Sequence, residues 1–254
     1  MLKIHETGAG APLLLVHGSP GDGRAWGRVL KALPGGFRAV APDLPGHGGS
    51  ESVPGDSPDR IGAMTERLAT VLDGIEGPVA LAGHSFGGVV ALHLASLRPE
   101  RIAQLALFEP VFFRALELAG ETGPLAAARA HFGAYLDAAG ADTPDAIAAM
   151  IDYWFGDGSF ARLPEPARGF LNSRTATNAL DVRASLTDTL PGERLAAMRC
   201  PVTIATGGAS PAITAEIATA LVGLLPDARH RVIDGATHAM LDSHASAVAE
   251  ILDS

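Results

Sequence analysis

The segment Gly83–Gly87, with the sequence GHSFG, holds the residue types that point most directly to chemistry. The apolar run Pro78–Ala82 before it is short enough for a buried strand. The small and apolar residues of Gly88–Ala95 after it are typical of a buried helix. A Gly-x-Ser-x-Gly sequence between a strand and a helix predicts a nucleophile elbow, a tight turn that lifts the hydroxyl of Ser85 above the edge of a sheet. The alternative is a glycine-rich turn in which the serine is incidental.

A serine hydroxyl is a poor nucleophile at neutral pH, so it needs a base that takes its proton as it attacks. Nine histidines compete for this role. We expect His17 to form a structural bond between loops, His47 to hold its own loop together, and the ring of His84 to point away from the serine. His238 follows the last predicted strand and comes after Ser85 in the chain, as the order serine, acid, histidine requires. We therefore predict that His238 is the general base.

Predicted strands alternate with predicted helices along most of the chain. The strands are Leu13–Val16, Phe37–Ala41, Pro78–Ala82, Ile102–Phe108, Val202–Ala205 and Arg229–Ile233. Alternation of this kind implies an α/β fold, with a mostly parallel sheet that carries helices on both faces. The functional loops of such a sheet gather at the carboxyl ends of its strands.

The alternation breaks between Val111 and Pro191, where the sequence is rich in alanine and in aromatic residues. We expect a helical cap at 111–191, inserted between two parts of the α/β core at 1–110 and 192–254. Its aromatic residues either form a small core of their own or supply apolar walls for a substrate, and both can hold at once. The cluster of Tyr153, Trp154 and Phe155 is our candidate for substrate binding.

Composition and charge exclude several classes of protein. A chain of 254 residues is long enough for one α/β domain with an insertion. A net charge of -9 argues against a nucleic-acid partner, which needs clustered Lys and Arg. The chain start lacks the apolar core of a signal peptide, and no run approaches membrane-spanning length. A single cysteine, Cys200, excludes an internal disulfide. We expect a cytoplasmic protein whose partner is a small-molecule substrate, and the oligomeric state stays open.

Together these motifs resemble the α/β-hydrolase superfamily, in its small, cap-bearing form, over nearly the whole chain. The resemblance rests on the Ser85 elbow and on the segments His17–Gly21 (HGSPG), Asp43–Ser50 (DLPGHGGS) and Gly235–His238 (GATH). It implies an eight-stranded sheet, of which the brief N-terminal segment leaves fewer strands here.

The resemblance also implies an oxyanion hole built from two backbone N–H groups. One follows the nucleophile, and the other comes from the loop after the first long strand. By position these are the N–H groups of Phe86 and Ser19. We expect the Ser19 hydroxyl to brace its loop, and Asp43 to pin its own loop rather than to act chemically.

The acid of the predicted triad is unusual. In most of the family an aspartate follows the next-to-last strand, but Ser210 stands there and a hydroxyl cannot supply the charge that stabilises an imidazolium. Glu109 ends the strand after the elbow helix, at the same edge of the sheet, and some members of this fold place their acid there. We predict that Glu109 pairs with His238. Asp181 and Asp188 in the cap are rivals, and an incomplete triad would favour a binding protein.

The sequence thus predicts a serine hydrolase of the carboxylesterase type, which cleaves a small, largely apolar ester or related acyl compound through an acyl-Ser85 intermediate. Alternatives with the same triad are carbon–carbon bond hydrolysis, acyl transfer and perhydrolysis. Another is a non-catalytic or slow ligand-binding protein. A related branch of the fold uses an aspartate nucleophile, but Ser85 occupies that position. No zinc or phosphate-loop motif is present, so the sequence implies no cofactor and no metal.

Overall fold

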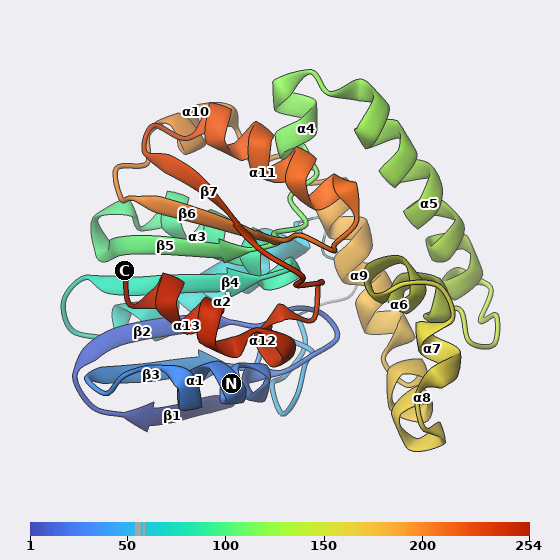
Figure 1. Cartoon of the computed structure of the whole chain (residues 1–254), viewed down its shortest axis with the longest axis horizontal. Coiled ribbons are helices and arrows are strands. Elements are labelled where there is room, and N and C mark those ends of the chain that lie inside the picture. The colour runs from blue at the N-terminus through green and yellow to red at the C-terminus, as the bar shows by residue number, and fades with distance from the viewer. Residues whose placement is uncertain (54–56, 58) are drawn as a thin grey trace.

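Seven strands form one sheet in the computed structural model, which describes residues 1–53, 57 and 59–254. Their order across the sheet is β1-β3-β2-β4-β5-β6-β7 (Figure 1). The strands are β1 (Ile4–Gly8), β2 (Ala11–Val16), β3 (Phe37–Pro42), β4 (Val79–His84), β5 (Ile102–Phe108), β6 (Val202–Gly207) and β7 (Ala228–Ile233). All neighbouring pairs are parallel except β1 and β3. The predicted mostly parallel α/β sheet is confirmed.

The edge strand β1 was missing from the expected strands. Among the described residues it pairs with β3 alone, four of its five residues are exposed, and its sequence IHETG lacks an apolar run. An edge strand with both faces near solvent leaves little hydrophobic pattern to detect. The sheet therefore has seven strands among the described residues, one fewer than the family resemblance implied.

Helices cover both faces of the sheet, as expected. In β2, Leu13 and Leu15 pack with α1 (Gly27–Ala32) and α13 (Ala245–Leu252). Leu14 and Val16 alternate to the other face, where α2 (Arg60–Asp73), α3 (Phe86–Leu97) and α11 (Ala212–Leu224) lie. A strand buried on both faces must be apolar at every position, which explains the continuous run of this strand. Figure 1 shows the two layers of helices on opposite sides of the sheet.

The segment between β5 and β6, which we call the helical insertion, is helical over residues 114–196, so its last helix lies beyond residue 191, where we expect the cap to end. It comprises α4 (Arg114–Ala119), α5 (Thr122–Gly140), α6 (Ala148–Phe155), α7 (Ser159–Arg162), α8 (Glu165–Asn172), α9 (Thr175–Leu186) and α10 (Gly192–Ala196). Much of it lies beyond the carboxyl ends of the parallel strands (Figure 1). Its buried residues Leu125, Phe132 and Trp154 belong to the same apolar cluster as one face of the sheet, so the insertion packs as an extension of that core.

In the part of the chain that the structure describes, no helix combines the length and the apolar character needed to cross a bilayer.

Candidate active site

Ser85 lies at the tight turn between β4 and α3. Its backbone angles are φ 54° and ψ −123°, a conformation that costs a non-glycine residue about 1–3 kcal/mol. The turn is held because the Ser85 N–H donates to the Phe108 carbonyl at 2.9 Å and the Ser85 carbonyl accepts from the Gly88 N–H at 2.9 Å. A Cβ at Gly83 would collide with the Gly87 carbonyl. The turn therefore requires glycine at this position.

Glu109 and His238 meet beside the elbow, although 129 residues separate them. Glu109 directly follows β5, and His238 lies in the loop between β7 and α12 (Met240–Ser243). The His238 Nδ1–H donates to Glu109 Oε2 at 2.6 Å, and the Gly207 N–H donates to Glu109 Oε1 at 2.7 Å. Because a carboxylate can only accept, these contacts place the imidazole proton on Nδ1 and leave Nε2 free.

The carboxyl of Glu109 is 1% exposed, so its charge needs compensation. Burial raises the pKa of this carboxyl. The hydrogen bond and charge of His238, the nearby Ser210 hydroxyl and the Gly207 N–H outweigh that effect, so the pKa lies below its usual value. Ser210, which stands where the family usually has an aspartate, thus lies near Glu109, the residue that we predicted as the acid.

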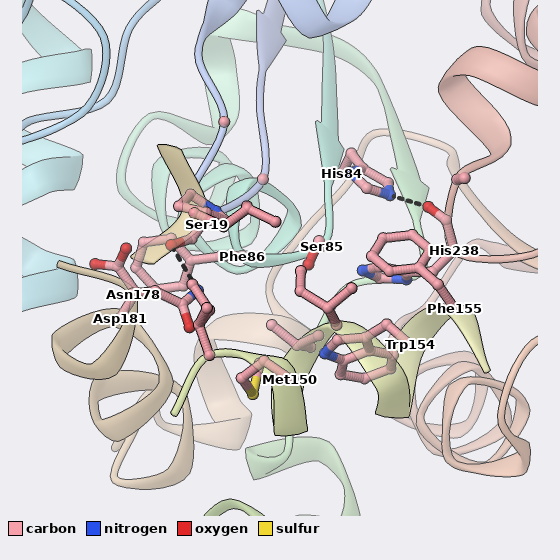
Figure 2. A pocket seen from close by; sticks show the side chains of 18 of the residues that line it. Ser19, His84, Ser85, Phe86, Met150, Trp154, Phe155, Asn178, Asp181 and His238 are labelled. Carbon is pink, nitrogen blue, oxygen red and sulfur yellow. Dashed lines mark hydrogen bonds between the residues drawn. The ribbon is translucent and has the colours of Figure 1, made fainter. Parts of the chain in front are cut away.

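Figure 2 shows Ser85 and the His238 ring pointing toward one another on the wall of one cavity. In the described part of the chain no hydrogen bond yet joins the Ser85 hydroxyl to His238. Catalytic hydrogen bonds are often long or misaligned without substrate and tighten when substrate binds. The arrangement can therefore support proton transfer from Ser85 once substrate binding brings the two side chains together.

His84 supports the same loop from the other side. Its Nε2–H donates to the His238 carbonyl at 3.0 Å, and its ring points away from Ser85, as expected (Figure 2). Burial and the neighbouring His238 together lower the pKa of His84 to about 3. The His84 imidazole is therefore neutral at physiological pH.

The two predicted oxyanion-hole residues, Ser19 and Phe86, both line this cavity. Phe86 is the first residue of α3, where the backbone N–H groups point out of the helix end. The Ser19 loop lies against the elbow, because a Cβ at Gly18 would be 3.0 Å from Ser85 Cβ. The Ser19 hydroxyl accepts from Asn178 Nδ2 at 3.0 Å and lies 3.3 Å from His47 Nε2, which matches the predicted bracing role.

A buried polar cluster beside Ser19 was not foreseen from the sequence. Arg60 Nε donates to Asp181 Oδ1 at 2.8 Å, and His47 Nε2 lies 3.0 Å from Asp181 Oδ2. All three side chains are at most 5% exposed. The three residues come from α2, α9 and the loop after β3, and no local sequence pattern joins such distant positions. The cluster attaches the helical insertion to the sheet.

The two rival acids are thereby assigned to other partners. Asp181 faces Arg60 and His47, and Asp188 pairs with His93 at 2.8 Å. Glu109 is the acid that the structure brings to His238.

The cavity has a volume of about 720 Å³ and lies between the strand ends and the helical insertion. Its lining is mostly apolar and includes Phe86, Phe113, Phe132, Met150, Trp154 and Phe155. Tyr153, which we had grouped with Trp154 and Phe155, is not among the described lining residues. Its ring packs instead on the rings of His131 and Phe132, with centroid distances of 4.4 and 5.0 Å. Successive residues of a helix are rotated by about 100°, so the three consecutive side chains of this cluster cannot all face one cavity.

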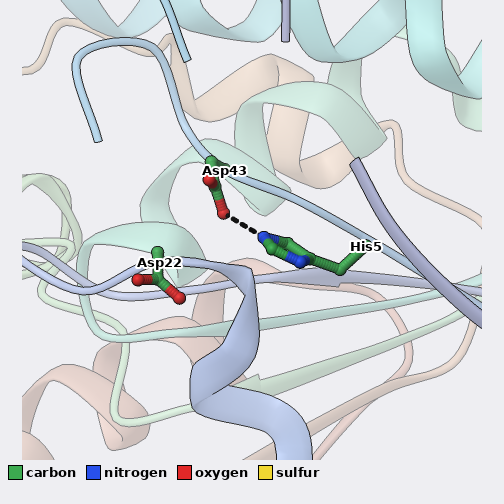
Figure 3. A group of neighbouring side chains, drawn as sticks. All are labelled: His5, Asp22 and Asp43. Carbon is green, nitrogen blue, oxygen red and sulfur yellow. Dashed lines mark hydrogen bonds and ion pairs between the residues drawn. The ribbon is translucent and has the colours of Figure 1, made fainter. Parts of the chain in front are cut away.

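A second group of side chains has the residue types of a metal site. Ligand atoms of His5, Asp22 and Asp43 lie within 4.8 Å of one another (Figure 3). Both oxygens of Asp43 are already engaged: Oδ1 accepts from His5 Nε2 and the Gly23 N–H, and Oδ2 accepts from the Gly49 N–H, each at 2.8 Å. Asp22 pairs with Arg24 at 2.7 Å. The bond from Gly49 pins the loop of Asp43, as expected, and the bonds from His5 and Gly23 join this loop to two other segments.

Three comparisons relate the chain to known proteins. The model of the alpha/beta hydrolase family matches residues 13–251. Lipase LipV of Mycobacterium tuberculosis is 43% identical over 112 residues, which cover 43% of this chain and 41% of the lipase. The 2-hydroxymuconate semialdehyde hydrolase of Pseudomonas sp. is 40% identical over 109 residues, covering 41% of this chain and 38% of that protein. The chain thus spans about two fifths of the length of these curated relatives.

A solved structure extends the likeness to the whole chain. The esterase EaEST of Exiguobacterium antarcticum superimposes with a TM-score of 0.75 at 18% identity, over 99% of this chain and 94% of that one. At this identity the likeness shows a shared fold.

The hydrogen bonds of the Asp43 carboxylate lead to a prediction about the free energy of unfolding. Burial raises the pKa of Asp43, but the N–H groups of Gly49 and Gly23 and the contact with His5 lower it below its usual value. A lowered pKa in the folded state stabilises the fold at neutral pH, and this contribution is lost as the pH falls through the folded-state pKa. Asp43→Asn should therefore lower the free energy of unfolding by about 2–3 kcal/mol at pH 7, because hydrogen bonds to a charged group are lost.

Urea unfolding of both proteins at pH 7 and at decreasing pH measures this effect, with Asp253→Asn at the exposed chain end as the matched control. The difference between wild type and Asp43→Asn should shrink in acid. Equal unfolding midpoints of wild type and Asp43→Asn at pH 7 would contradict a stabilising role for the Asp43 carboxylate.

Proposed function

The chain belongs to the alpha/beta hydrolase family, and we propose that it is a serine hydrolase that cleaves a small, largely apolar carboxylic ester or related acyl compound. The observation that carries the proposal is the buried 2.6 Å hydrogen bond between His238 and Glu109, on the wall of the cavity that Ser85 also lines. A base oriented by a carboxylate and facing a serine hydroxyl is the arrangement that nucleophilic acyl chemistry needs.

In the proposed reaction, Ser85 Oγ attacks the carbonyl carbon of the substrate while His238 Nε2 takes the hydroxyl proton. The tetrahedral intermediate collapses, the bond to the leaving alcohol breaks, and the imidazolium gives its proton to that alcohol. Water then attacks the acyl-Ser85 ester, with His238 again taking and returning a proton, and releases the acid and free Ser85. Glu109 keeps the imidazole in the Nδ1–H tautomer and stabilises the imidazolium in both halves of the reaction.

The negative charge that develops on the substrate oxygen requires donors that are already in place. We assign this role to the backbone N–H groups of Ser19 and Phe86. The side chain of Ser19 supports the assignment indirectly, because its hydrogen bond from Asn178 fixes the loop that carries the first donor.

The cavity supports a substrate of modest size. Its volume of about 720 Å³ is in the range of small-molecule pockets, and its mostly apolar lining favours an apolar acyl or alcohol group. Trp154 and Phe155 contribute to this wall from the helical insertion, so we propose that residues 111–191 act as a cap between the core segments 1–110 and 192–254.

A second candidate is hydrolysis of a carbon–carbon bond with the same three side chains. It is favoured by the 40% identity over 109 residues to a relative named 2-hydroxymuconate semialdehyde hydrolase. Product analysis on ester and β-diketone or vinylogous diketone substrates distinguishes the two reactions, since only the second releases a ketone or an enol.

Ser85→Ala should lower turnover of the best ester by about 10⁶-fold, since the members of a triad act as a unit. His238→Ala should have a similar effect. Steady-state kinetics over a series of esters of graded acyl length measures both losses, and Ser96→Ala on the same helix is the control that should keep wild-type activity. A Ser85→Ala protein with more than a tenth of wild-type turnover would contradict the proposal.

Glu109→Gln keeps the shape of the side chain and removes its charge, so turnover should fall by about 10³–10⁴-fold while the fold stays intact. Adding Ser210→Asp to this variant should restore part of the activity, because position 210 lies near Glu109. The exposed Glu117→Gln serves as control. Near-normal turnover in Glu109→Gln would refute the assignment of the acid.

A further inference from the structure

The His238 ring is covered on its faces by other rings. Trp154 stacks on it, with ring centroids 4.5 Å apart and planes inclined by 21°. His84 lies 4.8 Å away with planes inclined by 40°, and Phe155 lies 5.9 Å away at 56°. Trp154 comes from the helical insertion, whereas His238 and His84 come from the ends of strands. The insertion therefore touches the proposed base itself as well as enclosing the cavity (Figure 2).

The indole of Trp154 is held in place by its own neighbours. Phe132 on α5 stacks against it at 5.8 Å with planes inclined by 20°, and Tyr153 lies perpendicular at 4.9 Å. Trp154 is 6% exposed and His238 is 4% exposed, so the stacked pair is largely shielded from water. A ring fixed in this way can act on its partner without first losing conformational freedom.

We propose that Trp154 is a positioning residue for the reaction, whose indole face stabilises the protonated form of His238 and keeps its imidazole aligned between Ser85 and Glu109. This inference rests on the proposed function, in which an imidazolium forms in both halves of the reaction. A cation within about 6 Å of the face of an indole is attracted by the quadrupole of the ring, and the attraction is stronger where water is excluded.

The His84 ring beside His238 adds no competing charge, because the buried His84 is neutral at physiological pH. Glu109 from the end of β5 is the one charged group that contacts His238 directly among the described residues. Three other charged side chains line the cavity, and each has a partner. Asp242 of α12 pairs with Arg28 at 3.1 Å, Arg162 of α7 donates to the Asp157 carbonyl at 3.0 Å, and Asp181 of α9 pairs with Arg60 at 2.8 Å.

Substitution of Trp154 leaves all these charges in place. A change in the acid limb of the pH–rate profile is then caused by the loss of the indole ring stacked on His238. A residue that only forms the cavity wall would change KM and the preference for acyl length, but a residue that stabilises the imidazolium changes kcat with every substrate.

The test compares Trp154→Phe, Trp154→Leu and wild type with a short and a long acyl ester over a range of pH. Loss of the indole face makes His238 easier to deprotonate, so the acid limb of kcat/KM should move to lower pH by about half to one pH unit in Trp154→Leu. It should move less in Trp154→Phe. The kcat of Trp154→Leu should fall about 3- to 30-fold for both esters.

Met150→Ala is the matched control, since Met150 lines the same cavity one helical turn before Trp154 on α6 and carries no aromatic ring. It should change the dependence of KM on acyl length and leave the acid limb in place. If Trp154→Leu behaves in the same way, Trp154 is only a wall of the cavity and the inference is overturned. If Ser85→Ala is active, the proposed function fails instead, so the two failures are distinguishable.

A spectroscopic measurement on folded wild-type protein keeps the test independent of how well Trp154→Leu folds. The chain has two tryptophans, and Trp26 is fully buried against Phe108, so the difference between wild type and Trp154→Phe isolates the emission of Trp154. A protonated imidazole quenches a stacked indole. The Trp154 emission should therefore fall with the same midpoint as the acid limb, and emission that is independent of pH across this limb would contradict the inference.

Discussion

The buried carboxylate of Glu109 is the charge around which the site is arranged. A carboxylate excluded from water is tolerated only with compensating donors, and here the Gly207 N–H and the His238 Nδ1–H supply them at 2.7 and 2.6 Å. These donors come from the end of β6 and from the loop after β7. One side chain thus joins the carboxyl ends of three strands and fixes the imidazole that faces Ser85.

The helical insertion is fastened to the same edge by two different kinds of contact. On one side Asp181 pairs with Arg60 and lies against His47 in a buried polar cluster beside the Ser19 loop. On the other side Trp154 stacks on His238. The polar cluster requires specific geometry because unpaired buried charges are costly, whereas the aromatic contact buries apolar surface. Together they hold the insertion over the strand ends, where the cavity lies.

Local patterns in the sequence predicted the parts of the fold that local physics determines. Fully apolar runs such as Leu13–Val16 indicated buried strands, and the glycines around Ser85 indicated a tight turn. Because no acid directly follows β6, we predicted Glu109 as the partner of His238, and the structure brings the two together. The edge strand β1 was missed because it lacks an apolar pattern. The Arg60–Asp181 pair was missed because it joins positions 121 residues apart, and Tyr153 was misplaced because the sequence does not fix how a helix is rotated.

In the proposed function, Ser85 is a nucleophile activated by His238. Labelling with a fluorophosphonate tests it most directly, because this probe forms a stable adduct only with an activated serine. We expect one adduct per chain, located by peptide mass analysis on the segment that contains Ser85, and slow labelling or none in His238→Ala. A protein that stays unlabelled, or that carries its adduct on another residue, would contradict the account.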